Sequence, residues 1–465
     1  MTPDVLSKLR PWQPAVVEAA IAGLATGNFL NGSDLGTGKT FCAVAAAKLL
    51  NRRLLAVCRI GARNTWHEAG KLFGMDPNKI ETINRELLRS GTTKYGHWQR
   101  GPVNGNTGKT AKTFKWTVPS DTLLVVDEIH HDAGLDSANS KVLRAAVKDG
   151  LKIIGLSGTA ADDPRKMRAI GYMLGLHKDT DFYTWLARYG ADVNSWNCGV
   201  DPEFIEQSIG REMLRARREL MMTKIHQQMK ASGRFVRVRK SEIPNFPKCT
   251  IEPVCYEFNQ LDLKAVLDDM RIELEQLRRI SGNPKKEQRE VMMRALQKAE
   301  LYMVPGLVEE TEEAIEQGHT VAIFVQFSAT VQALAKRLNT DCLYTGAEPH
   351  EVREVNRMRI QRDEERKIIL NVGAGAESIG IQDVTGRFPR LGLVTPGFNP
   401  VTMNQLFGRL PRDGGKTPSI YRILFPAGTI LEAAYRACKA KTERINAFNG
   451  DIRLDEEDLT AGLNL

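Results

Sequence analysis

No apolar run in this sequence approaches the roughly 18 to 20 residues that a membrane-spanning helix needs, so we expect no membrane partner. The N-terminus also lacks the basic stretch and apolar core of a secretory signal, which favours a cytoplasmic location. The 7 cysteines include no C-x-x-C pair and no histidine partner at zinc spacing. Such scattered thiols are typical of a reduced compartment and predict neither disulfides nor a structural metal.

The positive charge of the chain is concentrated in one region. The whole chain of 465 residues carries +9, whereas residues 211–240 alone hold ten Lys or Arg against two Glu. Clustered positive charge is expected where a protein neutralises the phosphates of a nucleic acid. A solvated helix face followed by a strand would give the same pattern, so both interpretations stay open.

Short apolar runs alternate with helical patterns in two parts of the chain, which predicts an α/β fold with mostly parallel sheets and two similar lobes in tandem. We expect an N-terminal lobe over residues 1–242 with a basic helical insertion at about 163–240, a second lobe over 243–450, and an acidic tail over 451–465. The expected strands are 28–32, 54–58, 123–126 and 153–156 in the first lobe, and 321–325, 342–344, 367–371 and 391–394 in the second.

Residues 33–40 read Ser-Asp-Leu-Gly-Thr-Gly-Lys-Thr, between an expected strand and an Ala-rich expected helix. A phosphate-binding loop needs glycines that let backbone N–H groups surround the phosphates, a lysine for the β and γ oxygens, and a hydroxyl for Mg²⁺. Ser33 replaces the first glycine of that pattern. The residues predicted to bind ATP are Gly36, Thr37, Gly38, Lys39 and Thr40, with Thr40 also on Mg²⁺.

The tripeptide Gly-Lys-Thr also occurs at residues 108–110 and 415–417. The first copy lies in a polar turn that no expected strand precedes, and the second is followed by Pro418. Neither opens a helix at the end of a strand, so we interpret both as ordinary loops.

The apolar strand expected at 123–126 ends in two carboxylates, Asp127 and Glu128. A buried strand that delivers Asp and then Glu into a cleft suits ATP hydrolysis, with Asp127 holding Mg²⁺ and Glu128 orienting or deprotonating the attacking water. A strand that ends in ordinary solvated acids is the alternative, and the phosphate-binding loop upstream disfavours it.

The order of these segments resembles superfamily 2 helicases and translocases over almost the whole chain. This resemblance implies two RecA-like lobes that use ATP and Mg²⁺ to act on a nucleic acid. Gln13, in Arg-Pro-Trp-Gln at 10–13, would read the adenine. Residues 156–160 resemble the third motif, in which Ser157 and Thr159 would link the ATP site to the nucleic acid. In the second lobe residues 321–327 resemble the fourth motif and 375–383 the fifth, where Ser378 and Gly380 would contact nucleic acid.

Residues 405–412, Gln-Leu-Phe-Gly-Arg-Leu-Pro-Arg, match the sixth motif. The three- and four-residue spacing of Gln405, Gly408, Arg409 and Arg412 predicts that they share one face of a helix. A guanidinium fork suits the charge on a transferring γ-phosphate, so Gln405, Arg409 and Arg412 join the candidate catalytic residues. Pro411 departs from this pattern because it removes a backbone donor inside the expected helix.

Looser matches resemble the Snf-type translocases of duplex DNA. They are residues 55–58 with 66–68, the basic junction 235–240, and residues 425–432, which contain a G-T-I-x-E element. The junction makes Arg237, Arg239 and Lys240 candidate nucleic-acid contacts. The fifth motif departs from that family, since this chain has Ser-Ile-Gly-Ile-Gln at 378–382 where G-L-N-L is usual.

The sequence therefore predicts an ATP-hydrolysing motor that acts on DNA, duplex or branched, with RNA as a further candidate partner. A strand-separating RNA or DNA helicase shares every ATPase residue and stays an alternative. A motor subunit of a DNA-processing complex is another, and it would need a protein partner for targeting. The aromatic residues Phe182, Tyr183, Trp185 and Trp196 could in principle form a strand-separating wedge. The first three look more like helix packing, which favours translocation over unwinding.

Overall fold

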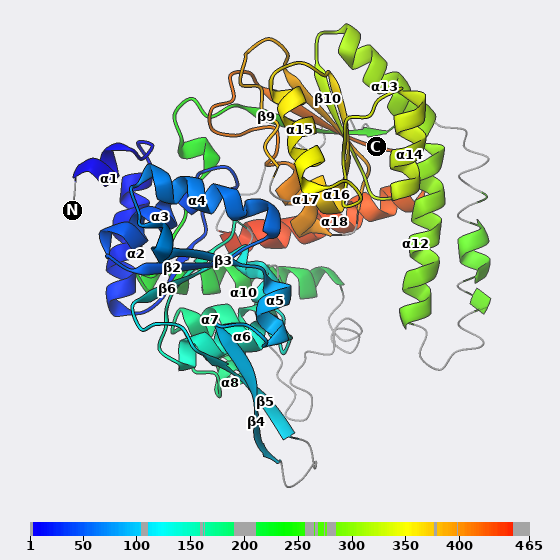
Figure 1. Ribbon diagram of the computed structural model, residues 1–465. Coiled ribbons are helices and arrows are strands. Elements are labelled where there is room, and N and C mark those ends of the chain that lie inside the picture. The colour runs from blue at the N-terminus through cyan, green and yellow to red at the C-terminus, as the bar shows by residue number, and fades with distance from the viewer. Residues whose placement is uncertain are drawn as a thin grey trace. The chain divides into compact units, whose positions relative to one another are not determined.

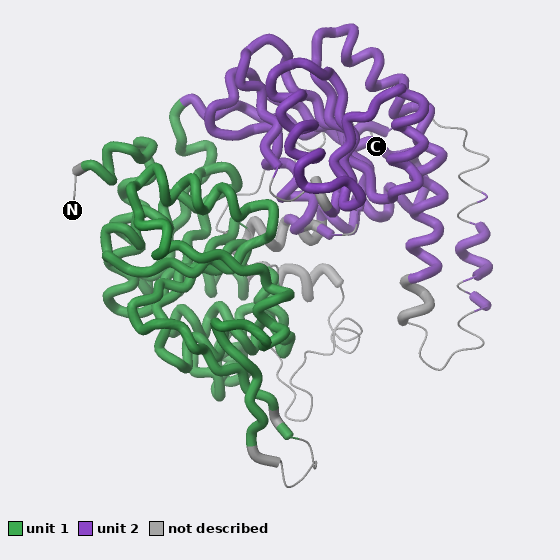
Figure 2. Tube along the Cα trace, in the orientation of Figure 1, with its two compact units in different colours: residues 1–244, 444–452 green, residues 245–443, 453–465 purple. Residues whose placement is uncertain are grey.

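The computed structural model describes residues 3–103, 110–158, 161, 163–189, 211–255, 265, 268–273, 275–276, 285–375, 379–397 and 399–449. The chain divides into two compact units, residues 1–244 with 444–452 and residues 245–443 with 453–465 (Figure 2). Each unit is built around a six-stranded sheet in which all neighbouring strands are parallel. Among the described helices, none combines the length and the apolar character needed to cross a membrane. The predicted α/β fold with two tandem RecA-like lobes is thus confirmed.

The sheet of the first unit has the strand order β3, β2, β6, β7, β1, β8. All four strands expected in this region are confirmed, whereas β3 was missed because its run, Ile-Glu-Thr-Ile, is short and half polar. The strands are β1 (Phe29–Asn31), β2 (Arg53–Val57), β3 (Ile80–Ile83), β6 (Thr122–Asp127), β7 (Lys152–Leu156) and β8 (Phe235–Val236).

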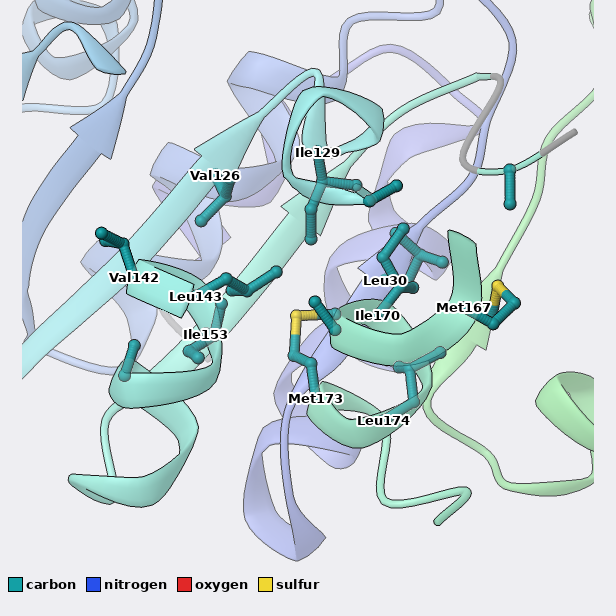
Figure 3. Close-up of a cluster of buried hydrophobic side chains, with 14 of the residues drawn as sticks. Leu30, Val126, Ile129, Val142, Leu143, Ile153, Met167, Ile170, Met173 and Leu174 are labelled. Atoms are coloured by element: carbon teal, nitrogen blue, oxygen red, sulfur yellow. The ribbon is translucent and has the colours of Figure 1, made fainter. Parts of the chain in front are cut away.

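Helices cover the first sheet, as parallel strands joined by crossovers require. One core cluster joins α2, α3 and α4 to the sheet, and α3 contributes a run of buried small residues, Cys42–Ala47. A second cluster joins α6, α7, α8 and α10, and Figure 3 shows Leu143, Ile153 and Ile170 among its members. The helices are α1 (Pro3–Ser7), α2 (Gln13–Thr26), α3 (Lys39–Leu49), α4 (Arg63–Leu72), α5 (Arg85–Ser90), α6 (Ala138–Lys148), α7 (Met167–Met173), α8 (Phe182–Ala187) and α10 (Arg211–Ala231).

An antiparallel hairpin, β4 (Gly96–Val103) with β5 (Thr110–Trp116), extends from the first unit (Figure 1). The expectation that no strand precedes the Gly-Lys-Thr at 108–110 was therefore wrong, because β4 is polar rather than apolar and gave no strand signal. Residues 104–109 lie outside the described part. Thr110 begins a strand and not a helix, so this copy does not have the context of a phosphate-binding loop.

Within the region predicted as a basic insertion, the described residues form helices α7, α8 and α10 and the short strand β8. Phe182 and Trp185 of α8 are buried in the second core cluster and pack around His177, which confirms that they serve as core packing. Trp196 lies outside the described residues, as do the side chains of residues 211–220. The idea that the basic side chains of 211–218 contact phosphates therefore stays a prediction.

The sheet of the second unit has the order β11, β12, β10, β13, β14, β9, and all four strands expected there are confirmed. The strands are β9 (Cys249–Cys255), β10 (Thr320–Val325), β11 (Leu343–Tyr344), β12 (Lys367–Asn371), β13 (Arg390–Val394) and β14 (Ser419–Phe425). The helices are α12 (Lys285–Tyr302), α13 (Val304–Glu316), α14 (Ser328–Arg337), α15 (His350–Gln361), α16 (Val372–Gly375), α17 (Pro400–Leu406) and α18 (Ile430–Asn449). Short 3₁₀ turns occupy Ile60–Ala62, Pro77–Lys79, Ile129–Asp132, Pro164–Lys166 and Lys240–Glu242.

Candidate functional site

The loop between β1 and α3 has the geometry expected of a phosphate-binding loop. Gly36 and Gly38 have φ values of 83° and 81°, in the left-handed region that favours glycine. A Cβ atom on Gly38 would lie 2.2 Å from Nε2 of Gln13, so a side chain there would have to displace the Gln13 amide. Lys39 and Thr40 begin α3 directly after this turn, and the free N–H groups of a helix N-terminus favour an anion. The strand, loop and helix predicted from the sequence are all present.

Gln13 is hydrogen-bonded to this loop. Its Nε2 donates to the carbonyl oxygen of Thr37 at 3.1 Å, and its Oε1 accepts a hydrogen bond from the backbone N–H of Arg10 at 2.9 Å. The indole Nε1 of Trp12 donates to the same Thr37 oxygen at 3.2 Å. The segment 10–13 thus holds the loop in place, and the adenine-reading role of Gln13 stays a prediction.

The ammonium group of Lys39 donates to the carbonyl oxygens of Ser33 and Asp34, at 2.8 and 2.9 Å. Burial lowers the pKa of Lys39, while the negative charges of Glu128, Asp34 and Asp127 act in the opposite direction. The lysine therefore lies within electrostatic reach of both predicted catalytic carboxylates. A cation held only by backbone carbonyls in a glycine-rich turn is placed to exchange them for phosphate oxygens.

The departure at Ser33 has a structural reason. Its Oγ accepts a hydrogen bond from the backbone N–H of Val238 at 3.0 Å, and its own N–H donates to Oδ1 of Asn31 at 3.0 Å. Glycine at this position could not accept the first of these bonds. The serine ties the loop to the segment that follows β8.

That segment contains Arg237, which we expected on a nucleic acid. Its guanidinium instead pairs with the carboxylate of Asp34 at 2.8 Å and donates to the carbonyl oxygens of Gly32 at 3.0 Å and Gly158 at 3.3 Å. Only 7% of the Arg237 side chain is exposed. The backbone N–H of Lys240 donates to the other Asp34 oxygen at 3.0 Å. Because these groups surround the loop, Arg237 braces it from within the first unit and differs from the exposed cation that charge counting suggested.

The other two cations of this junction are less enclosed. Arg239 pairs with Glu242 at 3.1 Å and its side chain is 33% exposed, while Lys240 is half-buried. Contact of Arg239 and Lys240 with nucleic acid stays a prediction.

Asp127 and Glu128 lie at the carboxyl end of β6. Glu128 has φ 50° and ψ 54°, a left-handed conformation that is uncommon for a residue with a side chain and is concentrated at functional sites. Burial and the neighbouring Glu128 charge raise the pKa of Asp127 to about 6, against the lowering effect of Arg85 and Lys39. A carboxylate with raised pKa beside a lysine and a second carboxylate fits the donor set that would hold Mg²⁺ next to a phosphate.

Arg85 holds this turn in place and was missed in the sequence. Its Nη2 donates to the carbonyl oxygens of Asp127 and Glu128, and its guanidinium forms a buried ion pair with Asp132 at 2.9 Å. Asn84 precedes it and caps α5 by accepting a hydrogen bond from the N–H of Leu87. That capping pattern marks a helix start, but no local signal shows that the next residue reaches the end of β6. Arg85 therefore supports the strained backbone at Glu128.

His130 connects the carboxylates to the third motif. Its Nδ1 lies 3.3 Å from Oε2 of Glu128 and 3.1 Å from Oγ of Ser157. The N–H of Ser157 donates to the carbonyl oxygen of Asn31 in β1. Ser157 thus contacts the turn that carries the carboxylates, its role in coupling to nucleic acid stays a prediction, and Thr159 lies outside the described residues. Within the described part of the chain, no three His, Cys, Asp or Glu side chains are grouped as a metal site would need.

The sixth motif differs from the expected helix. Helix α17 ends at Leu406, so Gly408, Arg409 and Arg412 lie in the turns that follow and the prediction of one shared helix face was wrong. Glycine lowers helix stability, and Pro411 lacks the N–H that a continued helix would use. Arg409 and Gln405 are buried, and Nη1 of Arg409 is 3.5 Å from the carbonyl oxygen of Ile379.

The fifth and sixth motifs lie side by side in the second unit. A Cβ atom on Gly380 would lie 2.9 Å from Nη1 of Arg412, so a side chain there would displace the guanidinium. The N–H of Ile381 also donates to the carbonyl oxygen of Arg409 at 3.3 Å. Glycine at 380 therefore leaves room for Arg412, and Ser378 lies outside the described residues.

A buried carboxylate supports the fourth motif and had no sequence signal. Glu300, on α12, accepts hydrogen bonds from the N–H groups of Gln326 and Phe327 at 2.6 and 3.1 Å. It also accepts from the hydroxyls of Thr330 and Thr395. These bonds join the turn after β10 to the end of β13.

The G-T-I-x-E element has a local role. The N–H of Gly428 donates to Oε2 of Glu432 at 2.7 Å, and the N–H of Glu432 lies 3.5 Å from Oγ1 of Thr429. This reciprocal arrangement resembles a capping box, here at the start of α18. The Snf-like spacing of this element can thus be explained by helix capping. The basic junction likewise has a structural role, since Arg237 supports the phosphate-binding loop.

No protein-family model matches the chain. The chain is 24% identical over 445 residues to a protein of Acanthamoeba polyphaga mimivirus named "Putative ATP-dependent RNA helicase", with 91% of this chain and 80% of that protein covered. Among solved structures it resembles "S. cerevisiae Dbp5 bound to RNA and ADP BeF3", with a TM-score of 0.47 and 14% identity over 97% of this chain and 93% of that one. At this TM-score the likeness supports no further argument, and the fold rests on the two sheets of the chain itself.

Proposed function

We propose that this chain, which has the organisation of a superfamily 2 helicase, is an ATP hydrolase whose turnover depends on a nucleic acid, with RNA as its main track. The observation that carries the proposal is the arrangement around Lys39 in the first unit. The lysine lies at the N-terminus of α3, held by loop carbonyls, and the charges of Asp127 and Glu128 act on it. Phosphate binding, metal binding and water activation need these three groups together.

The residues of the first unit have distinct roles in this proposal. Backbone N–H groups of the loop and Lys39 bind the phosphates, and Thr40 with Asp127 would hold Mg²⁺, which supplies charge neutralisation when bound. Glu128 orients the attacking water and accepts its proton. His130 transmits the state of Glu128 to Ser157 through contacts of 3.3 and 3.1 Å. Gln405, Arg409 and Arg412 stabilise charge on the transferring phosphate, an assignment that rests on the motif match.

The choice of RNA rests on the relative that matches most of this chain, which is named an RNA helicase. The Snf-type expectation of a duplex-DNA track has less support. Two of its three matches, the junction at 235–240 and the G-T-I-x-E element, make structural contacts inside their own units. The alternative of a strand-separating helicase, kept open by the sequence, is therefore the better-supported one.

The test is the ATPase rate of the purified full-length chain with single-stranded RNA, single-stranded DNA, duplex DNA and forked DNA offered in parallel. We expect the largest stimulation with RNA. Lys39→Ala serves as the control that removes turnover with every substrate. Stimulation by duplex DNA alone would replace this proposal with the translocase reading, and equal rates with and without any nucleic acid would reject both.

A further inference from the structure

The β4–β5 hairpin is anchored to the first unit by aromatic residues at its base. Phe114 makes edge contacts with Trp98 and Trp116, with ring centroids 5.3 and 5.4 Å apart. Nε1 of Trp116 donates to the carbonyl oxygen of Val142 at 3.1 Å, and Phe114 and Trp116 are buried in the core. These contacts fix the direction in which the rest of the hairpin extends (Figure 1).

Beyond this base the hairpin is exposed on both faces. Gln99 and Thr113 are paired on one face and Arg100 and Lys112 on the other, and all four are exposed. At these four described positions the ribbon presents no apolar side chain to a partner. Its outer part is built for contact with water or with a charged molecule.

Arg100 and Lys112 stand directly opposite each other in the strand register. Like charges in opposite positions of an antiparallel pair are destabilising. Among the described residues neither cation has an acidic partner, whereas Lys94 and Lys115 nearer the base pair with Glu81 and Asp149 at 3.0 and 2.7 Å. The chain thus neutralises the inner cations and leaves the outer pair to an external anion.

The sequence of this region carries one sign of charge. Residues 92–118 contain five Lys or Arg and no Asp or Glu, in a chain whose net charge is +9. A segment of this kind attracts a polyanion, and an arginine fork with a neighbouring lysine suits phosphate oxygens.

We propose that the β4–β5 hairpin is a nucleic-acid-binding arm in which Arg100 and Lys112 contact the phosphate backbone of the track. The identity of the partner rests on the proposed function, while the arm itself rests on exposure, register and charge. Contacts to phosphate carry no sequence information, so the arm adds affinity and orientation for any sequence.

The test compares the salt dependence of binding for the wild type and for the double variant Arg100→Ala with Lys112→Ala. Each lost phosphate contact lowers the slope of log affinity against log salt by about 0.7 on single strands and about 0.9 on B-DNA, so we expect a loss of about 1.4 on single-stranded RNA or about 1.8 on duplex DNA. The ATPase rate of the double variant, measured without nucleic acid, should equal that of the wild type. The swapped variant Arg100→Lys with Lys112→Arg keeps both charges and should keep the slope.

The matched control is Lys336→Ala with Arg337→Ala on α14, which removes the same two charges from exposed positions of the second unit. We expect it to leave the slope unchanged. If the hairpin variant kept the wild-type salt slope, the proposal that the hairpin binds nucleic acid would be wrong. The same conclusion would follow if the control variant lost as much of the slope as the hairpin variant. Binding of polyglutamate through Arg100 and Lys112, with RNA binding unchanged, would assign the hairpin to an acidic protein instead. Absence of any nucleic-acid binding by the wild type would reject the proposed function, which is a distinguishable result.

Discussion

The guanidinium of Arg237 lies 2.8 Å from the carboxylate of Asp34, so a residue beyond β8 is bound to the middle of the phosphate-binding loop. The same guanidinium donates to the carbonyl oxygen of Gly32, just before the loop, and to that of Gly158, after β7. Arg237 and Asp34 both belong to the first unit, and the arginine holds the phosphate-binding loop in place. Replacing Arg237 should therefore change nucleotide binding more than nucleic-acid binding.

Arg237→Ala should weaken ATP binding and lower the unfolding free energy of the protein by about 3 kcal/mol, because it leaves the half-buried Asp34 carboxylate without its charged partner. The salt slope for nucleic acid should not change. The control is Arg239→Ala, which removes a more exposed arginine that pairs with the neighbouring Glu242. Nucleotide titration and thermal unfolding check the first effect. A flattened salt slope with normal ATP affinity would return Arg237 to the nucleic-acid surface.

Arg85→Ala should reduce hydrolysis by about 10- to 100-fold while ATP still binds, a range typical of lost support around catalytic ligands. The arginine holds the carbonyl oxygens of Asp127 and Glu128, and its loss releases the left-handed turn at Glu128. Its removal also leaves Asp132 buried without a partner. Single-turnover hydrolysis and nucleotide binding are the measurements.

A double variant, Arg85→Ala with Asp132→Ala, separates the two effects. It removes the unpaired carboxylate, so part of the stability should return, but the turn is still unsupported and hydrolysis should stay slow. Full recovery of hydrolysis in the double variant would show that Arg85 acts on stability alone.

Mg²⁺ affinity should fall at acidic pH because of Asp127. Its folded-state pKa is raised to about 6 by burial and by Glu128, so below that pH the carboxyl binds a proton that a metal must displace. The affinity should decrease by about tenfold for each pH unit below 6 and level off above it. The stability of the metal-free protein should change in the opposite direction. Because the carboxyl pKa is raised in the folded state, the fold becomes more stable as pH falls through about 6. Mg²⁺ titrations at pH 5, 6 and 7.5 measure the first effect, with Asp127→Asn as the variant that should lose the pH dependence.

Arg412→Ala should lower the hydrolysis rate by on the order of 10³-fold, as expected for an arginine that stabilises the charge of a transferring phosphate. Gly380 leaves space for its guanidinium beside the fifth motif. Arg409→Ala is the comparison, since its side chain is buried. The single-turnover rate at saturating ATP decides between them, and a loss below tenfold in Arg412→Ala would leave Arg409 alone in this role.

Local patterns could predict the eight expected apolar strands, the phosphate-binding loop and the pair Asp127 and Glu128. Each depends on apolar periodicity or on glycine spacing within a few residues. Arg85 and Glu300 were missed, and the contacts of Arg237 with the loop were not foreseen, because their partners are distant in the chain and only the folded sheet brings them together. For Arg237 the charge of its neighbourhood suggested a surface, but the sheet places β8 next to β1.

The end of α17 was predicted wrongly for a different reason. Gly408 and Pro411 are both unfavourable in a helix interior, and Pro411 was recognised as a departure. The spacing of Gln405 and the two arginines nevertheless suggested a continuous helix, because three- and four-residue intervals also occur where a short helix runs into turns. Local chemistry outweighed periodicity at this position.

We propose that nucleic-acid-dependent ATP hydrolysis takes place at Lys39, Asp127 and Glu128. The most direct test is the steady-state rate of phosphate release by the wild type and by Glu128→Gln, with and without single-stranded RNA, beside an ATP-binding measurement on both proteins. We predict that RNA raises the wild-type rate, and that Glu128→Gln binds ATP normally but releases no phosphate above background with RNA present. Near-normal RNA-stimulated turnover in Glu128→Gln would contradict the account.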